Sequence, residues 1–564
     1  MLAVKLDFNP ANGMYVLFVD RGDPFTAAEL MTEYGLHHSE PASTFSTQCL
    51  FTPTPYAAVS FAQWATPAAR EALGWIVREV EASRKTHSDR HFDIPRATRD
   101  AGYDLWDYQK ADLEYMLERE RVLDADEPGL GKTPTAVVYA NEIQAQRTLV
   151  ICPANIRFQW IRKILEWSTL GETYPADSNL IYAVTSAKGG IHPNAAWTVI
   201  SYDLARKPGV IDALRQTKYD LLICDEAHAL KTIDSKRTRA VFGGGNDPLY
   251  HEALADRAKR VLLLSGTPLP NRPREAYIPA RHLDHASIDF YSEDRFNARF
   301  NPIEEREVIK HLPGGRQVRV IVKDEKSGRH DELQNRMRAH FMCRHLKREV
   351  LTQLKYPVYE LVRVDETAAI KRALKAESLL NIDPEMVEQG HFDPQEMGHI
   401  AEARRLMGEA MAPQVAEYIR TLLDGGEEKL TLFYHHINVG NILQHELQAY
   451  GVCRVDGSTG AVAKDALVQE FQANPAKRVM MGNLLSLGTG TDGLQHVCFH
   501  AIICEPSWVP GENIQAFDRL DRGGQLQLVQ GDIMVAPNSL SEKILASALR
   551  KLRNTHSALD RRIA

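Results

Sequence analysis

The chain has 564 residues, of which 44% are hydrophobic and 25% charged, and its formal net charge is −7. This length exceeds what one hydrophobic core supports, so about three or four domains are expected. The acidic balance excludes binding to nucleic acid through overall charge, so any such binding must use local basic patches. The seven cysteines form no Cys-x-x-Cys pair, which indicates a reducing compartment and argues against a zinc ribbon.

The N-terminal region lacks a basic start followed by an apolar run, and no apolar stretch approaches membrane-spanning length. We therefore expect a soluble, intracellular protein, cytoplasmic or nuclear, without a membrane partner. Residues 1–95 are expected to form a small accessory α+β domain, with strands near 14–19 and 48–51. A helix should follow, since Thr66 suits the N-cap and Pro67 the first helical position.

A glycine-rich run, DEPGLGKT at residues 126–133, lies between a predicted strand at 121–124 and a predicted helix around 136–140. A strand, a glycine loop and a helix start together form a cradle for phosphates, because backbone N–H groups and the helix N-terminus face the anion. Lys132 is predicted to reach the β- and γ-phosphates of ATP, and the Thr133 hydroxyl to bind Mg²⁺. The strict pattern has glycine where this chain has Asp126. The predicted nucleotide-binding residues are Gln109, Glu127, Gly129, Leu130, Gly131, Lys132 and Thr133.

Segments at 148–153, 198–202, 219–228 and 260–268 predict buried strands that alternate with helices, hence a parallel sheet covered on both faces. Function in such sheets lies at the carboxyl ends of the strands. Asp225 ends one of these strands and is predicted to hold Mg²⁺ through water, with Glu226 activating the attacking water. Gln109, about twenty residues before the glycine loop, offers an amide that could pair with an adenine edge.

A second set of predicted strands lies at 430–434, 478–482, 500–504 and 532–535, which predicts another α/β lobe. Before the last of these strands, Gln515, Arg519 and Arg522 are spaced to share one face of a helix. Two guanidiniums beside an amide suit a cleft that holds a triphosphate, because the planar fork pairs with phosphate oxygens. A solvated basic helix face is the alternative.

A short apolar stretch contains His496, Cys498, His500 and Cys504. Alternation would place the first three on one face of a strand. We interpret them as buried strand residues, and a zinc site is the alternative.

Further motifs follow in a fixed order. They are SGTP at 265–268 with NRPRE at 271–275, FMCRHLKREVL at 341–351, VDGST at 455–459, GTGTDGL at 488–494, WVP at 508–510 and QAFDRLDRGGQ at 515–525. Together with the glycine loop and DEAH at 225–228, this series resembles the Swi/Snf-type branch of superfamily 2 nucleic-acid-dependent ATPases, over about residues 100–535. His345 stands where the branch has the second Arg of Arg-Arg-x-Lys-x-x-Val. The position of residues 1–95 is similar to that of the extra domain of annealing helicases in the branch.

The resemblance implies two tandem RecA-like parallel-sheet lobes with helical insertions, at 96–356 and 357–564, and ATP bound between them. It implies catalytic roles for Lys132, Asp225, Glu226, Gln515, Arg519 and Arg522, with Mg²⁺ on Thr133 and Asp225. The nucleic-acid contacts it implies are Ser201, Arg344, Lys347, Gly457, Thr489, Thr491 and Trp508.

The expected function is a DNA-dependent ATPase that moves along double-stranded or branched DNA and remodels forks or protein–DNA complexes, with annealing activity included. Protein partners in replication, repair or recombination are implied. The alternatives are a strand-separating DNA or RNA helicase and a nucleotide-gated binding scaffold. Residues 269–356 are locally basic and are predicted to contact phosphates: Arg316, Arg319, Lys323, Lys326, Arg329, Arg336, Arg338, Arg344, Lys347 and Arg348. Residues 357–428 are an acidic insertion, and a C-terminal helix is expected from Ser539.

Overall fold

The computed structural model describes most of the chain. The described residues are 4–20, 30–31, 34, 36–39, 42–43, 47–170, 180–192, 194–244, 252–269, 272–311, 317–325, 328–351, 357–379, 394–488, 491–507, 510–539, 541–542 and 545. The predicted C-terminal helix and most of the acidic part of the second insertion lie outside these residues.

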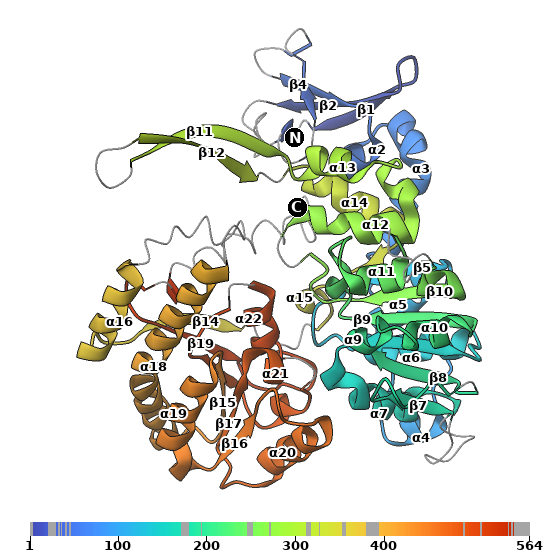
Figure 1. Ribbon diagram of the computed structural model, residues 1–564. Coiled ribbons are helices and arrows are strands. Elements are labelled where there is room, and N and C mark those ends of the chain that lie inside the picture. The colour runs from blue at the N-terminus through green and yellow to red at the C-terminus, as the bar shows by residue number, and fades with distance from the viewer. Residues whose placement is uncertain are drawn as a thin grey trace.

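The first lobe is built on a seven-stranded sheet in the order β13-β5-β10-β9-β6-β8-β7, with every pair parallel (Figure 1). Its strands are β5 Arg121–Asp124, β6 Thr148–Cys152, β7 Ile181–Val184, β8 Trp197–Ser201, β9 Tyr219–Asp225, β10 Ala258–Leu264 and β13 Met342–Cys343. Its helices include α5 Asp107–Leu117, α6 Lys132–Glu142, α7 Arg157–Trp167, α9 Tyr202–Ala205, α10 Val210–Arg215, α11 Lys236–Phe242, α12 Tyr277–Asp284, α13 Glu293–Phe300, α14 His330–His340 and α15 Lys347–Val350.

Successive residues of a strand point to opposite faces, so one sheet feeds two cores. Leu222 and Cys224 of β9 belong to the core under α10 and α12, whereas Leu221 and Ile223 belong to the core under α6 and α7. The near-continuous apolar strands predicted from the sequence are therefore explained by helices on both faces.

The second lobe repeats this plan with a six-stranded parallel sheet, in the order β14-β19-β18-β15-β17-β16. Its strands are β14 Val358–Arg363, β15 Leu430–Tyr434, β16 Val452–Val455, β17 Val479–Asn483, β18 His500–Ile503 and β19 Gln530–Val535. Its helices are α16 Ala368–Leu379, α18 Pro394–Asp424, α19 Ile437–Leu447, α20 Ala461–Ala473, α21 Leu484–Gly488 and α22 Pro510–Phe517. Leu432 and Phe433 of β15 enter different cores, on opposite faces of the sheet. The prediction of two tandem RecA-like lobes is confirmed.

The N-terminal region forms a four-stranded antiparallel sheet, β1-β2-β4-β3, with α3 packed beside it. The bounds are β1 Lys5–Asn9, β2 Met14–Asp20, β3 His37–His38, β4 Thr47–Thr52, α2 Pro55–Ala58, α3 Pro67–Ala82 and α4 Arg96–Asp100. The predicted N-cap of α3 is confirmed, because the Thr66 side chain accepts a hydrogen bond from the Ala69 N–H. The boundaries predicted at residues 95 and 356 remain predictions.

Helix α14 joins this sheet to the first lobe, and its basic residues are interior. Asn335 donates to the Tyr56 carbonyl at 2.9 Å, and the Arg336 guanidinium lies over the Tyr56 ring. Arg336 also binds Glu332 and Asp289, while Arg338 donates to the carbonyls of Ser83 and Arg344. The prediction that Arg336 and Arg338 contact phosphates is wrong for this structure, because both side chains are buried and bound within the protein.

The sequence analysis missed a two-stranded antiparallel ribbon in the same insertion, β11 Ile303–His311 and β12 Gln317–Glu325. Figure 1 shows this ribbon extending away from the first lobe on the side where the second lobe lies. Among the helices of the described residues, none is long and apolar enough to cross a membrane.

Candidate nucleotide site between two lobes

The glycine loop leaves the sheet at the end of β5 and enters α6 at Lys132, as predicted. Gly129 has a φ of +91°, and a Cβ at this position would lie 2.7 Å from the Cβ of Arg522 in the second lobe. A glycine is therefore needed both for the backbone conformation and for the approach of the other lobe. Gly266 of the SGTP motif also permits a close approach, since a Cβ there would collide with the Pro128 ring.

Helix α5 supports the glycine loop through side-chain hydrogen bonds. The Leu130 carbonyl accepts hydrogen bonds from the Tyr108 hydroxyl and the Gln109 amide, both at 3.0 Å. The Gln109 side-chain oxygen accepts from the Trp106 N–H at 2.8 Å. Gln109 is buried, and both ends of its amide are engaged by backbone, so in this structure it holds the loop. Its contact with adenine remains a prediction.

Lys132 points back along the loop. Its ammonium donates to the Asp126 carbonyl at 2.5 Å and the Glu127 carbonyl at 3.2 Å. These carbonyls hold the Lys132 ammonium at the glycine loop, where the oxygens of a triphosphate would compete with them for it.

Asp225 ends β9, and Glu226 follows it directly. In the sheet, β10 lies between β9 and β5, the strand that leads into the glycine loop. Asp225 accepts from the Trp160 ring N–H at 2.7 Å and from the Glu226 N–H at 2.8 Å. Glu226 has a left-handed backbone, with φ at +51°, and its carboxylate lies 3.2 Å from the His228 ring. Such strain in a residue other than glycine is typical of functional sites.

The pKa values of the two carboxylates are shifted in opposite directions. Burial and the neighbouring Glu226 charge raise the pKa of Asp225 to about 6. Burial would also raise the pKa of Glu226, but the His228 hydrogen bond and nearby cations hold it below its usual range. Glu226 is thus an anion at neutral pH and can accept a proton, as a general base must.

The arginines come from the second lobe, but not from one helix face as predicted. Helix α22 ends at Phe517, and Arg519 and Arg522 lie in the turns that follow. The guanidiniums still converge, because both donate to the Thr491 carbonyl, at 3.3 Å and 3.5 Å. Burial and the Arg522 charge lower the pKa of Arg519 to about 10, and its charge is felt by Glu226 in the other lobe.

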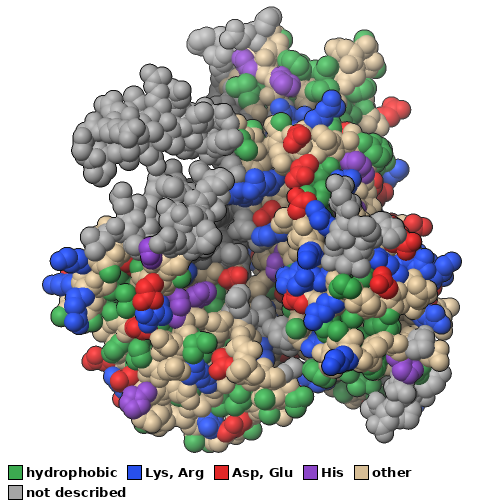
Figure 2. Space-filling view, in the orientation of Figure 1, with side chains coloured by type: hydrophobic (Ala, Val, Ile, Leu, Met, Phe, Trp, Pro, Cys, Tyr) green, Lys and Arg blue, Asp and Glu red, His purple; other side chains and the backbone are tan. Residues whose placement is uncertain are grey.

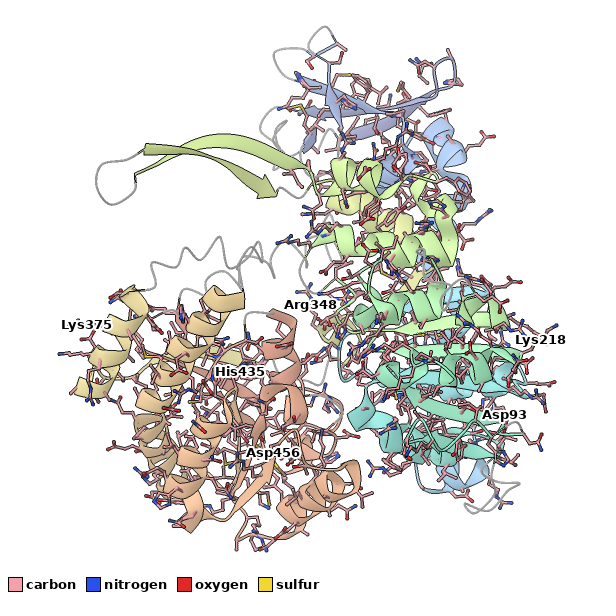
Figure 3. All side chains as sticks on the ribbon, viewed as in Figure 1. Asp93, Lys218, Arg348, Lys375, His435 and Asp456 are labelled. Atoms are coloured by element: carbon pink, nitrogen blue, oxygen red, sulfur yellow. The ribbon has the colours of Figure 1, made fainter. Side chains whose placement is uncertain are left out.

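Two further contacts connect the lobes at this site. Gln515 donates to the Thr267 hydroxyl at 3.4 Å. Lys347, just before the linker to the second lobe, places its ammonium against Asp518 and Asp521. Its backbone N–H donates to Glu127 of the glycine loop at 2.7 Å. Figure 3 labels the neighbouring Arg348 at this junction of the lobes.

Most of the predicted nucleic-acid residues face inward. Four of them are buried and have internal partners: Ser201, Arg344, Lys347 and Thr491. Ser201 caps α9, Arg344 binds the carbonyl of Ala125, and the Thr491 hydroxyl donates to Leu487. In this structure these four side chains are enclosed by protein, and their contact with nucleic acid remains a prediction. Thr489 and Trp508 lie outside the described residues.

Gly457 is the exception. It lies in an exposed turn after β16, next to Asp456, which Figure 3 labels on the second lobe. Asp456 shapes this turn by accepting from the N–H and hydroxyl of Ser458, at 2.9 Å and 2.6 Å. Figure 2 also shows Lys and Arg side chains on the part of the first lobe that borders the junction.

The cluster of His and Cys residues in the second lobe does not lie on one strand face. Strand β18 begins only at His500, so His496 and Cys498 precede it. His500 is enclosed by two carboxylates, with Glu427 at 2.9 Å and Asp532 at 2.8 Å from its ring nitrogens. The buried-residue interpretation holds for His500, Cys498 and Cys504.

Sequence reasoning missed three residues that shape the site: Trp160, His228 and Asp518. His228 was part of the quoted DEAH run and could have been found there. Trp160 and Asp518 gave no signal, since an indole on a helix and an acidic residue beside arginines are common.

Comparisons with known proteins show to which family the chain belongs. A family model for the SNF2-related domain matches residues 108–409. The chain belongs to the SNF2-related domain family. It is 28% identical over 469 residues to the Xenopus tropicalis SWI/SNF-related matrix-associated actin-dependent regulator of chromatin subfamily A-like protein 1, covering 82% of this chain and 45% of that one. It is 28% identical over 470 residues to the Mus musculus DNA annealing helicase and endonuclease ZRANB3, covering 81% and 41%.

This SNF2-related chain thus spans less than half the length of both relatives. Among solved structures, a Sulfolobus solfataricus SWI2/SNF2 ATPase core in complex with dsDNA matches with 16% identity and a TM-score of 0.36, over 82% of this chain and 98% of that one.

Proposed function

We propose that this chain is a DNA-dependent ATPase that moves along double-stranded DNA and remodels forks or protein–DNA complexes, annealing included. The observation that carries the proposal is the meeting of two half-sites: the glycine loop packs against Arg522, and Glu226 lies within the electrostatic reach of Arg519. Two relatives support the choice of DNA, since their names specify chromatin and DNA annealing. Such an enzyme works inside the cell, in the cytoplasm or nucleus.

In this proposal each residue has a definite task. Lys132 leaves the loop carbonyls for the phosphate oxygens, Glu226 orients the attacking water and takes its proton, and Arg519 and Arg522 neutralise charge on the transferred phosphoryl group. Closure of the lobes is required because no lobe holds all of these groups. DNA that binds both lobes would favour closure and so raise the rate.

The residues also fit Mg²⁺. Asp225 ends its strand beside the part-buried carboxylate of Glu226, and its pKa is raised by burial and by that neighbouring negative charge, which a divalent cation would relieve. Asp225 would hold the ion through water and Thr133 directly. When bound, the ion would neutralise negative charge that develops on the phosphates.

A place for the nucleobase adjoins α5. Thr86, Trp106, Tyr108, Lys110, Glu349 and Val350 line a hollow there. The Trp106 ring is half exposed, at 49%, and can stack on a base. We propose that adenine lies against this ring.

The test is ATP hydrolysis with and without duplex DNA, using Lys132→Ala as the control. We expect strong stimulation by duplex in the wild type and no hydrolysis by the variant. Equal rates with and without DNA would contradict the proposed closure. Displacement of a triplex strand without unwinding of a long duplex supports movement along DNA, whereas efficient unwinding would favour a strand-separating helicase.

A further inference from the structure

A buried charged cluster lies under the glycine loop. Asp112 of α5, Asp126 at the start of the loop and His345 before α15 are each no more than 2% exposed. One potential ligand atom from each lies within 4.8 Å of the others. Asp124 is adjacent, with its carboxylate accepting from the Asp126 N–H at 3.1 Å. Three buried carboxylates therefore gather around one imidazole.

The surroundings of His345 show which form of the ring they accommodate. Its Nδ1 lies 3.1 Å from the Asp126 carboxylate and 3.3 Å from that of Asp112. Its Nε2 lies 3.2 Å from the Lys85 carbonyl oxygen. A carbonyl oxygen and an ionised carboxylate only accept, so with Asp126 ionised both ring nitrogens carry hydrogen. The ring is an imidazolium and supplies the cation that the carboxylates need.

His345 also links the glycine loop to a distant segment. Its N–H donates to the Asp126 carboxylate at 2.6 Å, and its carbonyl accepts from the Glu127 N–H at 3.1 Å. These bonds continue the pairing of β13 with β5 into the loop itself. The carbonyl of Asp126 in turn holds the Lys132 ammonium. Two residues after His345, Lys347 contacts the second lobe.

We propose that His345 is a positioning residue for ATP hydrolysis: its imidazolium, between Asp112, Asp126 and the Lys85 carbonyl, fixes the start of the glycine loop to the segment that leads into the second lobe. The inference rests on the proposed function. It also accounts for Asp126 at a position where the strict loop pattern has glycine, since glycine offers no carboxylate to the imidazolium.

The experiment compares His345→Gln and His345→Arg with the wild type in DNA-stimulated ATPase assays. Gln keeps hydrogen bonding but loses the charge, so kcat/KM should fall by about 10- to 100-fold, as expected when a catalytic loop shifts by roughly 1 Å. Arg restores a cation, and the related branch has Arg at this position, so activity near neutral pH should be within about threefold of the wild type. The exposed His445→Gln is the matched control.

A pH profile separates positioning from simple structural support. The groups next to the His345 ring are Tyr108, Asp112 and Asp126, and the carboxylates of the cluster also interact with Asp124, Lys132 and Cys343. Burial alone would lower the pKa of His345, but Asp112 and Asp126 raise it well above its ordinary value. The imidazolium is thus kept at neutral pH and lost at alkaline pH. The activity of the wild type should fall relative to His345→Arg as pH rises, because Arg stays charged.

Parallel alkaline profiles for wild type and His345→Arg would overturn the proposal, and this comparison holds even if His345→Gln fails to fold. One equivalent of a transition metal in the wild type that is lost in His345→Gln would also overturn it, because the ring would then be a ligand. If the wild type hydrolyses no ATP, the proposed function fails instead. An active wild type matched by an active, folded His345→Gln refutes only the inference.

Discussion

The contact of Lys347 with Asp518 and Asp521 gives the sharpest prediction about closure of the lobes. Lys347→Met keeps the aliphatic stem and removes the ammonium, leaving two carboxylates that are 4% and 8% exposed without their cation. Breaking a buried ion pair in this way costs about 3–5 kcal/mol. Burial already raises the pKa of Asp518 to about 6 despite the lysine, so the variant should bind a proton there at neutral pH and recover part of that cost.

Because the pair crosses between lobes, this cost falls on the closed arrangement and spares each lobe's core. The closed population, and with it kcat/KM, should drop by about 10²- to 10³-fold, with each 1.36 kcal/mol worth a factor of ten. Small-angle scattering or a pair of fluorophores, one on each lobe, would report the opening. Lys347→Arg should retain most activity, and adding Asp521→Asn to Lys347→Met should restore part of it. Unchanged interlobe distance and unchanged ATPase rate in Lys347→Met would refute the reasoning.

Three other changes test the site and the second lobe. Gly129→Ala should lower kcat/KM at least about tenfold in ATPase assays, because a left-handed backbone costs an L-residue roughly 1–2 kcal/mol and its Cβ would meet Arg522; wild-type kinetics would contradict the packing. Glu226→Gln should abolish hydrolysis while ATP still binds, measured by calorimetry, and loss of binding would instead indicate a structural role. In the second lobe, burial would lower the pKa of His500, but Asp532 and Glu427 raise it to about 9. The interactions that raise this pKa stabilise the fold fully below about pH 6.5, and their stabilisation is lost as pH rises through about 9. His500→Gln should therefore lower the melting temperature at pH 7 and much less at pH 10; an equal loss at both would argue against the ion pair.

The fold was predictable because its strands are continuous apolar runs. The segment predicted at 219–228 became β9, which ends at Asp225, since burial on both faces favours a nearly continuous apolar run. Strand β13 could not be found, because it is only the pair Met342–Cys343 and forms by pairing with β5. The ribbon of β11 and β12 was overlooked, although Val318, Val320 and Val322 alternate along the second strand and a Pro-Gly-Gly run at 313–315 precedes it.

Site residues that lie in one continuous segment could be predicted. Contacts between residues that are distant in the sequence could not. Gly129 and Glu226 follow from local patterns. Arg344 looked like a phosphate contact, yet its guanidinium binds the Ala125 and Gly266 carbonyls. Counting charges cannot separate these outcomes, because backbone carbonyl oxygens can satisfy a buried guanidinium as phosphate oxygens would an exposed one. The prediction that Arg519 lies on a helix was wrong for another reason: periodicity does not indicate where a helix ends.

The stretch from Arg344 to Lys347 explains how ATP binding and lobe movement can be coupled. Arg344 and His345 bind the start of the glycine loop, and Lys347 binds the second lobe through Asp521 at 3.0 Å. If the second lobe swings away, Lys347 must either break its ion pair or draw this stretch with it. Drawing the stretch would pull on the Asp126 carboxylate, and the Asp126 carbonyl holds Lys132. If Lys132 binds phosphate as proposed, it is linked to the second lobe through a single residue, Asp126, and we expect hydrolysis to depend on closure through this link as well as through the arginines.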